Sequence, residues 1–128
     1  MEFTLKQIKK AEVWILVLNG YLGNDEFCQV AEALALLLEQ KQGCVILDLE
    51  TLSFATARSL AQFLVCGREF RRQGGELKLV GLSPELSRLA EMAGFNAVKD
   101  FEPDMATALT KMSQTPQSKP RQPPKSKK

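Results

Sequence analysis

The amino-acid sequence predicts an α/β fold, with a mixed β-sheet of four to five strands and four helices packed on it. Short apolar runs alternate along the chain with longer segments in which apolar residues recur every three or four positions. A hydrophobic content of 45% in 128 residues is enough for one core and hardly for two. The order β-β-α-β-α-β-α-β-α requires right-handed crossovers between parallel strands, so a sheet covered by helices is the expected solution.

The chain opens with a predicted hairpin. Residues 3–8 partly alternate between apolar and polar types, and residues 13–18 form a stronger apolar run. Asn24 or Asp25 is then expected to cap a helix that Gly43 stops. Its apolar positions repeat with helical spacing, at Phe27, Val30, Ala31, Leu34, Leu37 and Leu38.

The next unit is a strand followed by a loop and a helix. Residues 44–49 are apolar on both sides except at Asp48, as in a central strand covered on both faces or heavily on one. A short polar connection, residues 50–53, leads toward a helix start near Thr56. The helix has apolar or small residues at Leu60, Leu64, Gly67 and Phe70, and Gly74 supplies the turn that ends it.

The last third of the chain repeats the alternation. Residues 76–80 predict a fourth strand, and Ser83 followed by Pro84 predicts a helix start with its N-cap. A final short strand is expected around residues 96–98, and Pro103 is expected to open a terminal helix. The inward positions of these two helices are Leu86, Leu89, Ala90 and Ala93, and then Met105, Ala108, Leu109 and Met112.

Residues 45–60 and 74–86 resemble the central region of STAS domains, the family of bacterial anti-sigma-factor antagonists and sulfate-transporter tails. The resemblance extends from about Phe3 to Met112. The antagonists read Phe-x-Asp-Ser-Ser-Gly-Leu at the helix start, and a partner kinase phosphorylates the first Ser. Aligned on its first and last residues, this chain reads Phe54-Ala-Thr-Ala-Arg-Ser-Leu60. Ala57 therefore stands at the phosphoacceptor position, and the usual acceptor hydroxyl is absent.

The same helix start has its own physical chemistry. Its first backbone N–H groups have no partner within the helix, and the helix dipole is positive there, which suits an anion or a modifiable hydroxyl. Thr56 is expected to accept a hydrogen bond from the N–H of Arg58 or Ser59 as an N-cap, or else to be a displaced phosphoacceptor. Arg58 opposes the dipole, so we expect either an acidic partner or an intrachain pair with Glu50 or an acid of the first helix.

The composition does not favour an enzyme. The chain has no histidine, the commonest general base and metal ligand. Asp48 could be a catalytic carboxylate or a metal ligand, but a hydrogen bond to the loop before Thr56 is the preferred interpretation. Cys28, Cys44 and Cys66 are widely separated and are read as small buried hydrophobes. We therefore expect no catalytic residues, no metal and no cofactor.

The charge is unevenly distributed. Residues 113–128 contain five of the positive residues and no acid, and removing them from the total of +2 leaves −3 for residues 1–112. A specific nucleic-acid surface on the domain is therefore not expected. Residues 113–128 are expected to be a disordered, basic, Pro/Lys-rich tail, either a solubilising terminus or an arm for anionic lipid, RNA or an acidic partner.

The resemblance implies a non-catalytic module for protein–protein interaction, involved in signal transduction, partner switching and transcription regulation. The expected partner is an anti-sigma factor of the serine-kinase type; the alternative is a role as the STAS subunit of a lipid-transport ABC system, docking on its ATPase. A cytoplasmic location is expected, since no apolar run approaches the roughly twenty residues of a membrane span. The expected partner-binding residues are Asn24, Thr56, Ala57, Arg58 and Ser59, with Thr56 or Ser59 as possible phosphorylation sites. The sequence leaves the oligomeric state open.

Overall fold

A computed structural model describes residues 2–10, 12–41, 43–95 and 101–114. Over these residues the predicted α/β class is confirmed: a six-stranded mixed sheet carries four helices. The main path of the sheet runs β1-β2-β3-β5-β6, and β4 pairs with β2 beside it. The strand expected around residues 96–98 and the basic segment after Gln114 lie outside the described residues.

The predicted N-terminal hairpin is present. Strand β1, Phe3–Lys10, pairs antiparallel with β2, Val13–Leu22, with Phe3 opposite Gly20. Gly20 has a φ of +97°, and a Cβ there would lie 2.1 Å from the carbonyl oxygen of Glu2. This close approach requires glycine. At the same point the pairing of β2 with β4, Leu52–Ala55, shifts register.

The middle of the sheet is parallel. Strand β3, Cys44–Asp48, lies between β2 and β5, Glu76–Val80, and β6, Phe101–Glu102, extends the sheet beyond β5. The prediction that residues 44–49 form a covered central strand is therefore confirmed. The polar connection expected at residues 50–53 is wrong in part, because Leu52 and Ser53 already belong to β4.

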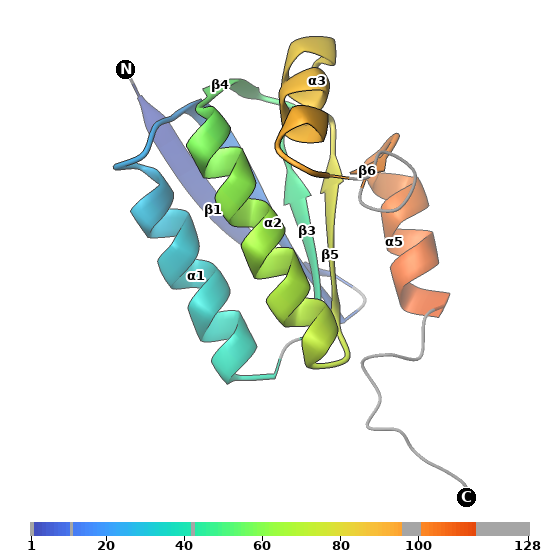
Figure 1. The fold of residues 1–128 in the computed structure, drawn as a ribbon. Coiled ribbons are helices and arrows are strands. Elements are labelled where there is room, and N and C mark those ends of the chain that lie inside the picture. Colours follow the sequence, from blue (N-terminus) through green and yellow to red (C-terminus); the bar gives the residue numbers. More distant parts are fainter. Residues whose placement is uncertain (1, 11, 42, 96–100, 115–128) are drawn as a thin grey trace, which may run out of the picture.

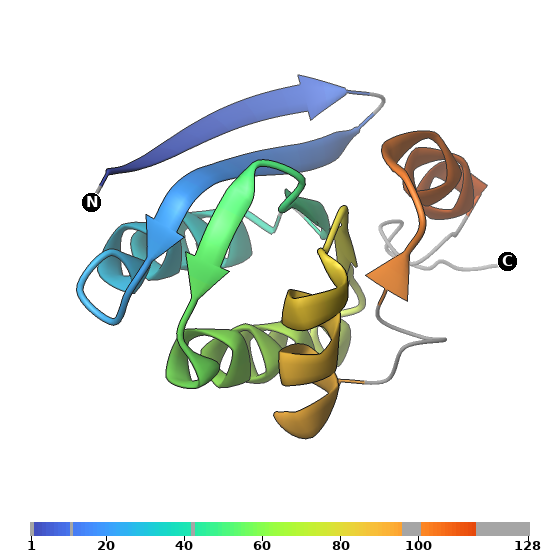
Figure 2. The ribbon, with the colours of Figure 1, turned by 90° about the horizontal axis from the view of Figure 1, so that it is seen from above.

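The helices cover the two faces unequally. Helices α1, Phe27–Glu39, and α2, Ala57–Arg72, lie side by side on one face (Figure 1). Helix α3, Pro84–Met92, packs against α2, whereas α5, Met105–Gln114, lies on the opposite side of the sheet (Figure 2). Helix α5 thus continues two residues past the predicted boundary at Met112.

The predicted caps are confirmed at one helix and wrong at another. The Ser83 hydroxyl accepts a hydrogen bond from the N–H of Leu86 at the start of α3, as expected. Neither Asn24 nor Asp25 caps α1: the N-cap position is Glu26, whose side chain makes no capping bond. The Glu26 carboxylate instead accepts from the N–H of Gly23, and Asn24 bonds across to another loop, as described below.

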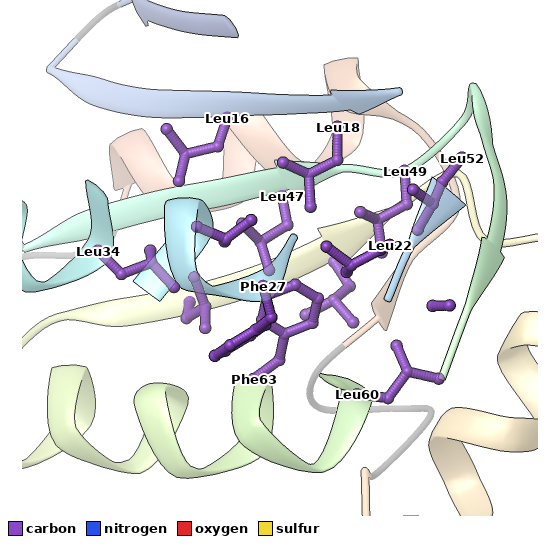
Figure 3. Close-up of a cluster of buried hydrophobic side chains, with 14 of the residues drawn as sticks. Leu16, Leu18, Leu22, Phe27, Leu34, Leu47, Leu49, Leu52, Leu60 and Phe63 are labelled. Carbon is purple, nitrogen blue, oxygen red and sulfur yellow. The ribbon is translucent and has the colours of Figure 1, made fainter. Parts of the chain in front are cut away.

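Two apolar clusters fill the two sides of the sheet. The larger lies between the sheet and helices α1 and α2 (Figure 3), and the smaller lies under α5. Beside the smaller cluster the Glu102 carboxylate, 2% exposed, is 3.4 Å from the ammonium of Lys78 and 3.2 Å from that of Lys111. This ion cluster links β5, β6 and α5, and loss of the lysine partners would leave the buried Glu102 carboxylate uncompensated.

The cysteines do not all behave as predicted. Cys44 is buried in the smaller cluster, and burial raises the pKa of the half-buried Cys66 thiol. Cys28, in contrast, is exposed on α1, because its position in the helix points away from the sheet. The expectation that all three are buried is wrong for Cys28.

The first prediction tests the core. Leu47 on β3 has no exposed surface, so Leu47→Ala leaves a cavity and should lower the free energy of unfolding by about 2–5 kcal/mol. Leu36→Ala on α1 is the matched control, because Leu36 is 53% exposed and its truncation should change stability by less than about 0.5 kcal/mol. Urea unfolding at equilibrium measures both. Equal effects at the two positions would contradict the central position of β3.

Candidate functional site

The start of α2 follows directly from the end of β4. Thr56 has extended backbone angles, φ −77° and ψ 153°, and its hydroxyl oxygen accepts a hydrogen bond from the N–H of Ser59 at 3.1 Å. This is the predicted N-cap, with Ser59 rather than Arg58 as the donor. The Thr56 hydroxyl oxygen thus serves as the cap acceptor in place of the aspartate that the resemblance leads one to expect at this position.

Further hydrogen bonds tie this helix start to the loop before α1. The Thr56 hydroxyl donates to the Asn24 side-chain oxygen at 2.8 Å, and the Ser59 hydroxyl donates to the Gly23 carbonyl at 3.3 Å. The two hydroxyl oxygens are 2.9 Å apart, and the N–H of Thr56 donates to the Leu22 carbonyl at 3.2 Å. The beginnings of α1 and α2 are therefore held together as one surface.

The structure brings the five predicted residues together but exposes them unequally. Asn24, Ala57 and Arg58 are exposed, and Thr56 is half-buried. Ser59 is only 1% exposed, since its side chain points back toward Gly23. A kinase could reach the Ser59 hydroxyl only after the first turn of α2 opened, so of the two possible phosphorylation sites only Thr56 has an accessible side chain in this conformation.

Arg58 is a cation without a partner in the part of the chain that the structure describes. The ion pairs there involve other residues, and neither Glu50 nor an acid of α1 lies within 4.0 Å of its guanidinium. Of the two explanations considered for Arg58, the intrachain pair is therefore wrong. The guanidinium remains available on the surface next to Ala57.

An aromatic pair near the helix start was not predicted. Tyr21 on β2 and Phe54 on β4 are register partners, and their rings stack with centroids 5.1 Å apart and an interplanar angle of 7°. Phe54 is nevertheless 45% exposed, two residues before Thr56. No local sequence pattern signals this pair, because it depends on β4, where part of a loop was expected.

The surroundings offer little for catalysis. The Asp48 carboxylate accepts a hydrogen bond from the N–H of Glu50 at 3.2 Å, which supports the loop-holding role preferred for it. No group of three His, Cys, Asp or Glu side chains within the described residues could hold a metal ion. Two cavities, of about 250 and 280 Å³, are lined by other residues, around Phe70 and around Ser87.

The length and polarity of the helices decide whether any of them could span a membrane. In the segments that the structure describes, every helix is too short or too polar to cross a membrane.

Solved structures with the same fold have low sequence identity to this chain. An anti-sigma factor antagonist from Mycobacterium paratuberculosis is 15% identical, with a TM-score of 0.77 over 87% of this chain and 94% of that one. The Bacillus cell fate determinant SpoIIAA, in its phosphorylated form, is 19% identical, with a TM-score of 0.68 over 86% and 97%.

Part of a larger protein is also similar. A murine solute carrier 26 anion transporter is 17% identical, with a TM-score of 0.61, over 84% of this chain but only 18% of the transporter. At these identities the three structures establish the fold and do not assign a partner.

The family comparison covers most of the sequence. A model of the STAS domain matches residues 5–108, which extend from within β1 to the first turn of α5. Together with the shared fold, this match means that the chain belongs to the STAS domain family.

Proposed function

We propose that this protein is a non-catalytic STAS module that works by docking the start of α2 onto a protein partner and does so without phosphorylation at the usual position. The observation that carries the proposal is Ala57, a methyl side chain exposed at the first position of α2 between the half-buried Thr56 and the unpaired Arg58. A surface of this kind resembles the permanently unphosphorylated form of an antagonist.

The surface has the composition of a docking site. Phe54 is exposed and precedes the exposed Arg58 by four residues in the chain, and aromatic residues and arginine are the types that most often dominate binding energy at interfaces. The hydrogen bonds among Gly23, Asn24, Thr56 and Ser59 hold the two loops in place. A preorganised surface loses less conformational entropy on binding, which favours affinity.

The partner class follows from the resemblance and from charge. Arg58 favours an acidic patch on the partner. An anti-sigma factor of the serine-kinase type is the proposed partner, in keeping with the antagonists of the same fold. The ATPase of a lipid-transport ABC system is the competing partner, and binding studies with both proteins distinguish the two.

Regulation would then differ from that of a phosphorylated antagonist. SpoIIAA has been solved in phosphorylated and unphosphorylated forms, whereas residue 57 of this chain has no hydroxyl to modify. We infer a constitutive binder, whose activity is set by its amount or by its partner rather than by a phosphate at this position.

The second prediction places a charge at the centre of the contact. Ala57→Asp should reduce affinity for the partner at least roughly thirtyfold, because an unpaired charge buried in an interface costs at least about 2 kcal/mol. The domain should fold normally, since an acid in the first turn is favourable to the helix dipole. Titration calorimetry measures the affinity.

Ala106→Asp is the matched control. Ala106 is also exposed in the first turn of a helix, but α5 lies on the other side of the sheet. Its substitution should leave the affinity unchanged. If Ala57→Asp bound as tightly as the unaltered protein, the docking surface would have to lie elsewhere.

The third prediction concerns Arg58. Arg58→Ala should weaken the complex mainly through a slower association rate, and the difference from the unaltered protein should shrink as salt is raised. Stopped-flow or surface plasmon resonance measurements at several salt concentrations report the rate. Arg88→Ala, an exposed arginine on α3, serves as the control. A salt-independent loss would argue against an electrostatic role.

The fourth prediction restores the missing hydroxyl. Incubation of Ala57→Ser with a serine-kinase-type partner and ATP should add one phosphate at residue 57 and release the complex, whereas the unaltered protein should remain unmodified and bound. Intact-mass and peptide mass spectrometry measure the modification, with Ala106→Ser as the control. Stoichiometric phosphate on Thr56 of the unaltered protein would contradict constitutive binding.

A further inference from the structure

The outer surfaces of α1 and α2 carry opposite charges. Between residues 24 and 40 the chain has four acids and no lysine or arginine, namely Asp25, Glu26, Glu32 and Glu39. Helix α2 has one acid, Glu69, and four arginines, Arg58, Arg68, Arg71 and Arg72. Since the two helices lie side by side on one face of the sheet, an acidic surface adjoins a basic one (Figure 1).

Part of each surface is unpaired. Glu32 and Glu39 are exposed and lie seven residues apart, two turns along the same side of α1; we call them the acidic stripe. Arg68 and Arg72 are exposed one turn apart on α2; we call them the basic stripe. Arg72 pairs with Glu69, but Glu32, Glu39 and Arg68 make no ion pair within the residues described.

Each stripe is accompanied by an exposed aliphatic side chain. Leu36 is 53% exposed on α1 and Val65 is 57% exposed on α2. The two are among the few large apolar residues of the described chain that solvent reaches to this extent. The face therefore combines an unpaired acidic stripe with a basic stripe in which Arg68 is unpaired and Arg72 shares its charge with Glu69, and each stripe has an exposed aliphatic residue beside it.

The symmetry of this face selects its partner. Helices α1 and α2 run in the same direction, because their first turns meet at Asn24 and Thr56. Consider a twofold axis that lies in the plane of contact and runs parallel to the helices. It places α1 of the first copy over α2 of the second, and α2 of the first copy over α1 of the second. A twofold axis in the same plane but perpendicular to the helices would place α1 over α1, so that the acidic residues of the two copies would face each other. Only the first arrangement matches every stripe with its opposite.

We propose that the α1/α2 face binds the same face of a second copy of this chain, in that arrangement. A different protein would need both an acidic and a basic stripe in the matching order, and a second copy has them by construction. The contact does not use Phe54 or Ala57, so it is independent of the docking proposed at the start of α2.

The small size of the face indicates a weak contact. Helices of 13 and 16 residues are roughly 20 and 24 Å long, and neighbouring helices are about 10 Å apart. The face thus offers about 400 Å² per copy, half of the roughly 800 Å² per partner of a standard interface. The dimer should be weak, with a dissociation constant of roughly 10 µM to 1 mM, and should weaken further in high salt.

Analytical ultracentrifugation between about 10 µM and 2 mM, at low and high salt, tests the proposal, since this range spans the expected dissociation constant. The unaltered protein should dimerise with concentration, and salt should weaken the dimer several-fold. A chain with reversed acids, Glu32→Lys with Glu39→Lys, has two basic surfaces and should be monomeric. A chain with reversed bases, Arg68→Glu with Arg72→Glu, has two acidic surfaces and should also be monomeric. An equimolar mixture of the two chains should dimerise again.

Controls separate this result from misfolding. Circular dichroism should show native spectra for both reversed chains, and Lys6→Glu on β1, away from the face, should dimerise as the unaltered protein does. Leu36→Ser with Val65→Ser, which leaves every charge in place, should weaken the dimer at least about tenfold. A monomer at 2 mM, a dimer that the reversals do not affect, or a failure of the mixture to dimerise would each overturn the proposal.

Discussion

The burial of β3 on both faces is the constraint on which the rest of this structure depends. Val45, Ile46 and Leu47 have no exposed surface, and their side chains alternate between the two faces of the sheet. Each face must therefore be covered. Helices α1 and α2 cover one side and α5 covers the other, and parallel pairing of β3 with β2 and β5 requires that helices serve as the crossovers.

This arrangement also determines where the exposed loops meet. Parallel strands end at the same edge of the sheet, so the loop after β2 and the loop after β4 leave it together. The Thr56 hydroxyl and the Asn24 amide then come within hydrogen-bonding distance although they are 32 residues apart. The candidate docking surface is thus a consequence of strand order, and its exposed residues are those that the core does not need.

The residues at the start of α2 that differ from the antagonist motif, within residues 54–60, have distinct physical roles. Thr56 caps the helix, Ser59 fills a buried position with a hydroxyl that bonds to a carbonyl, and Ala57 at the first helical position has no hydroxyl. The helix start is capped, and the position where the resemblance places the phosphoacceptor has no hydroxyl. Stability and recognition are therefore separable here, which is the basis for proposing docking without the phosphate switch.

The sequence by itself determined the fold class, the central strand, the α3 cap at Ser83 and the Thr56 cap, because each depends on residues close together in the chain. It also identified Ala57 as the position that lacks a hydroxyl. Local patterns were sufficient for these features, since apolar spacing and capping chemistry act within one or two turns.

Only the tertiary structure decided the remaining features. The pairing of β4 with β2, the Tyr21–Phe54 stack and the bond from Thr56 to Asn24 join segments about thirty residues apart, and no local pattern specifies them. The burial of Ser59 and the lack of a partner for Arg58 depend on which loops lie above them. Side-chain exposure and long-range pairing are properties of the packed chain, because they depend on neighbours that folding alone brings together.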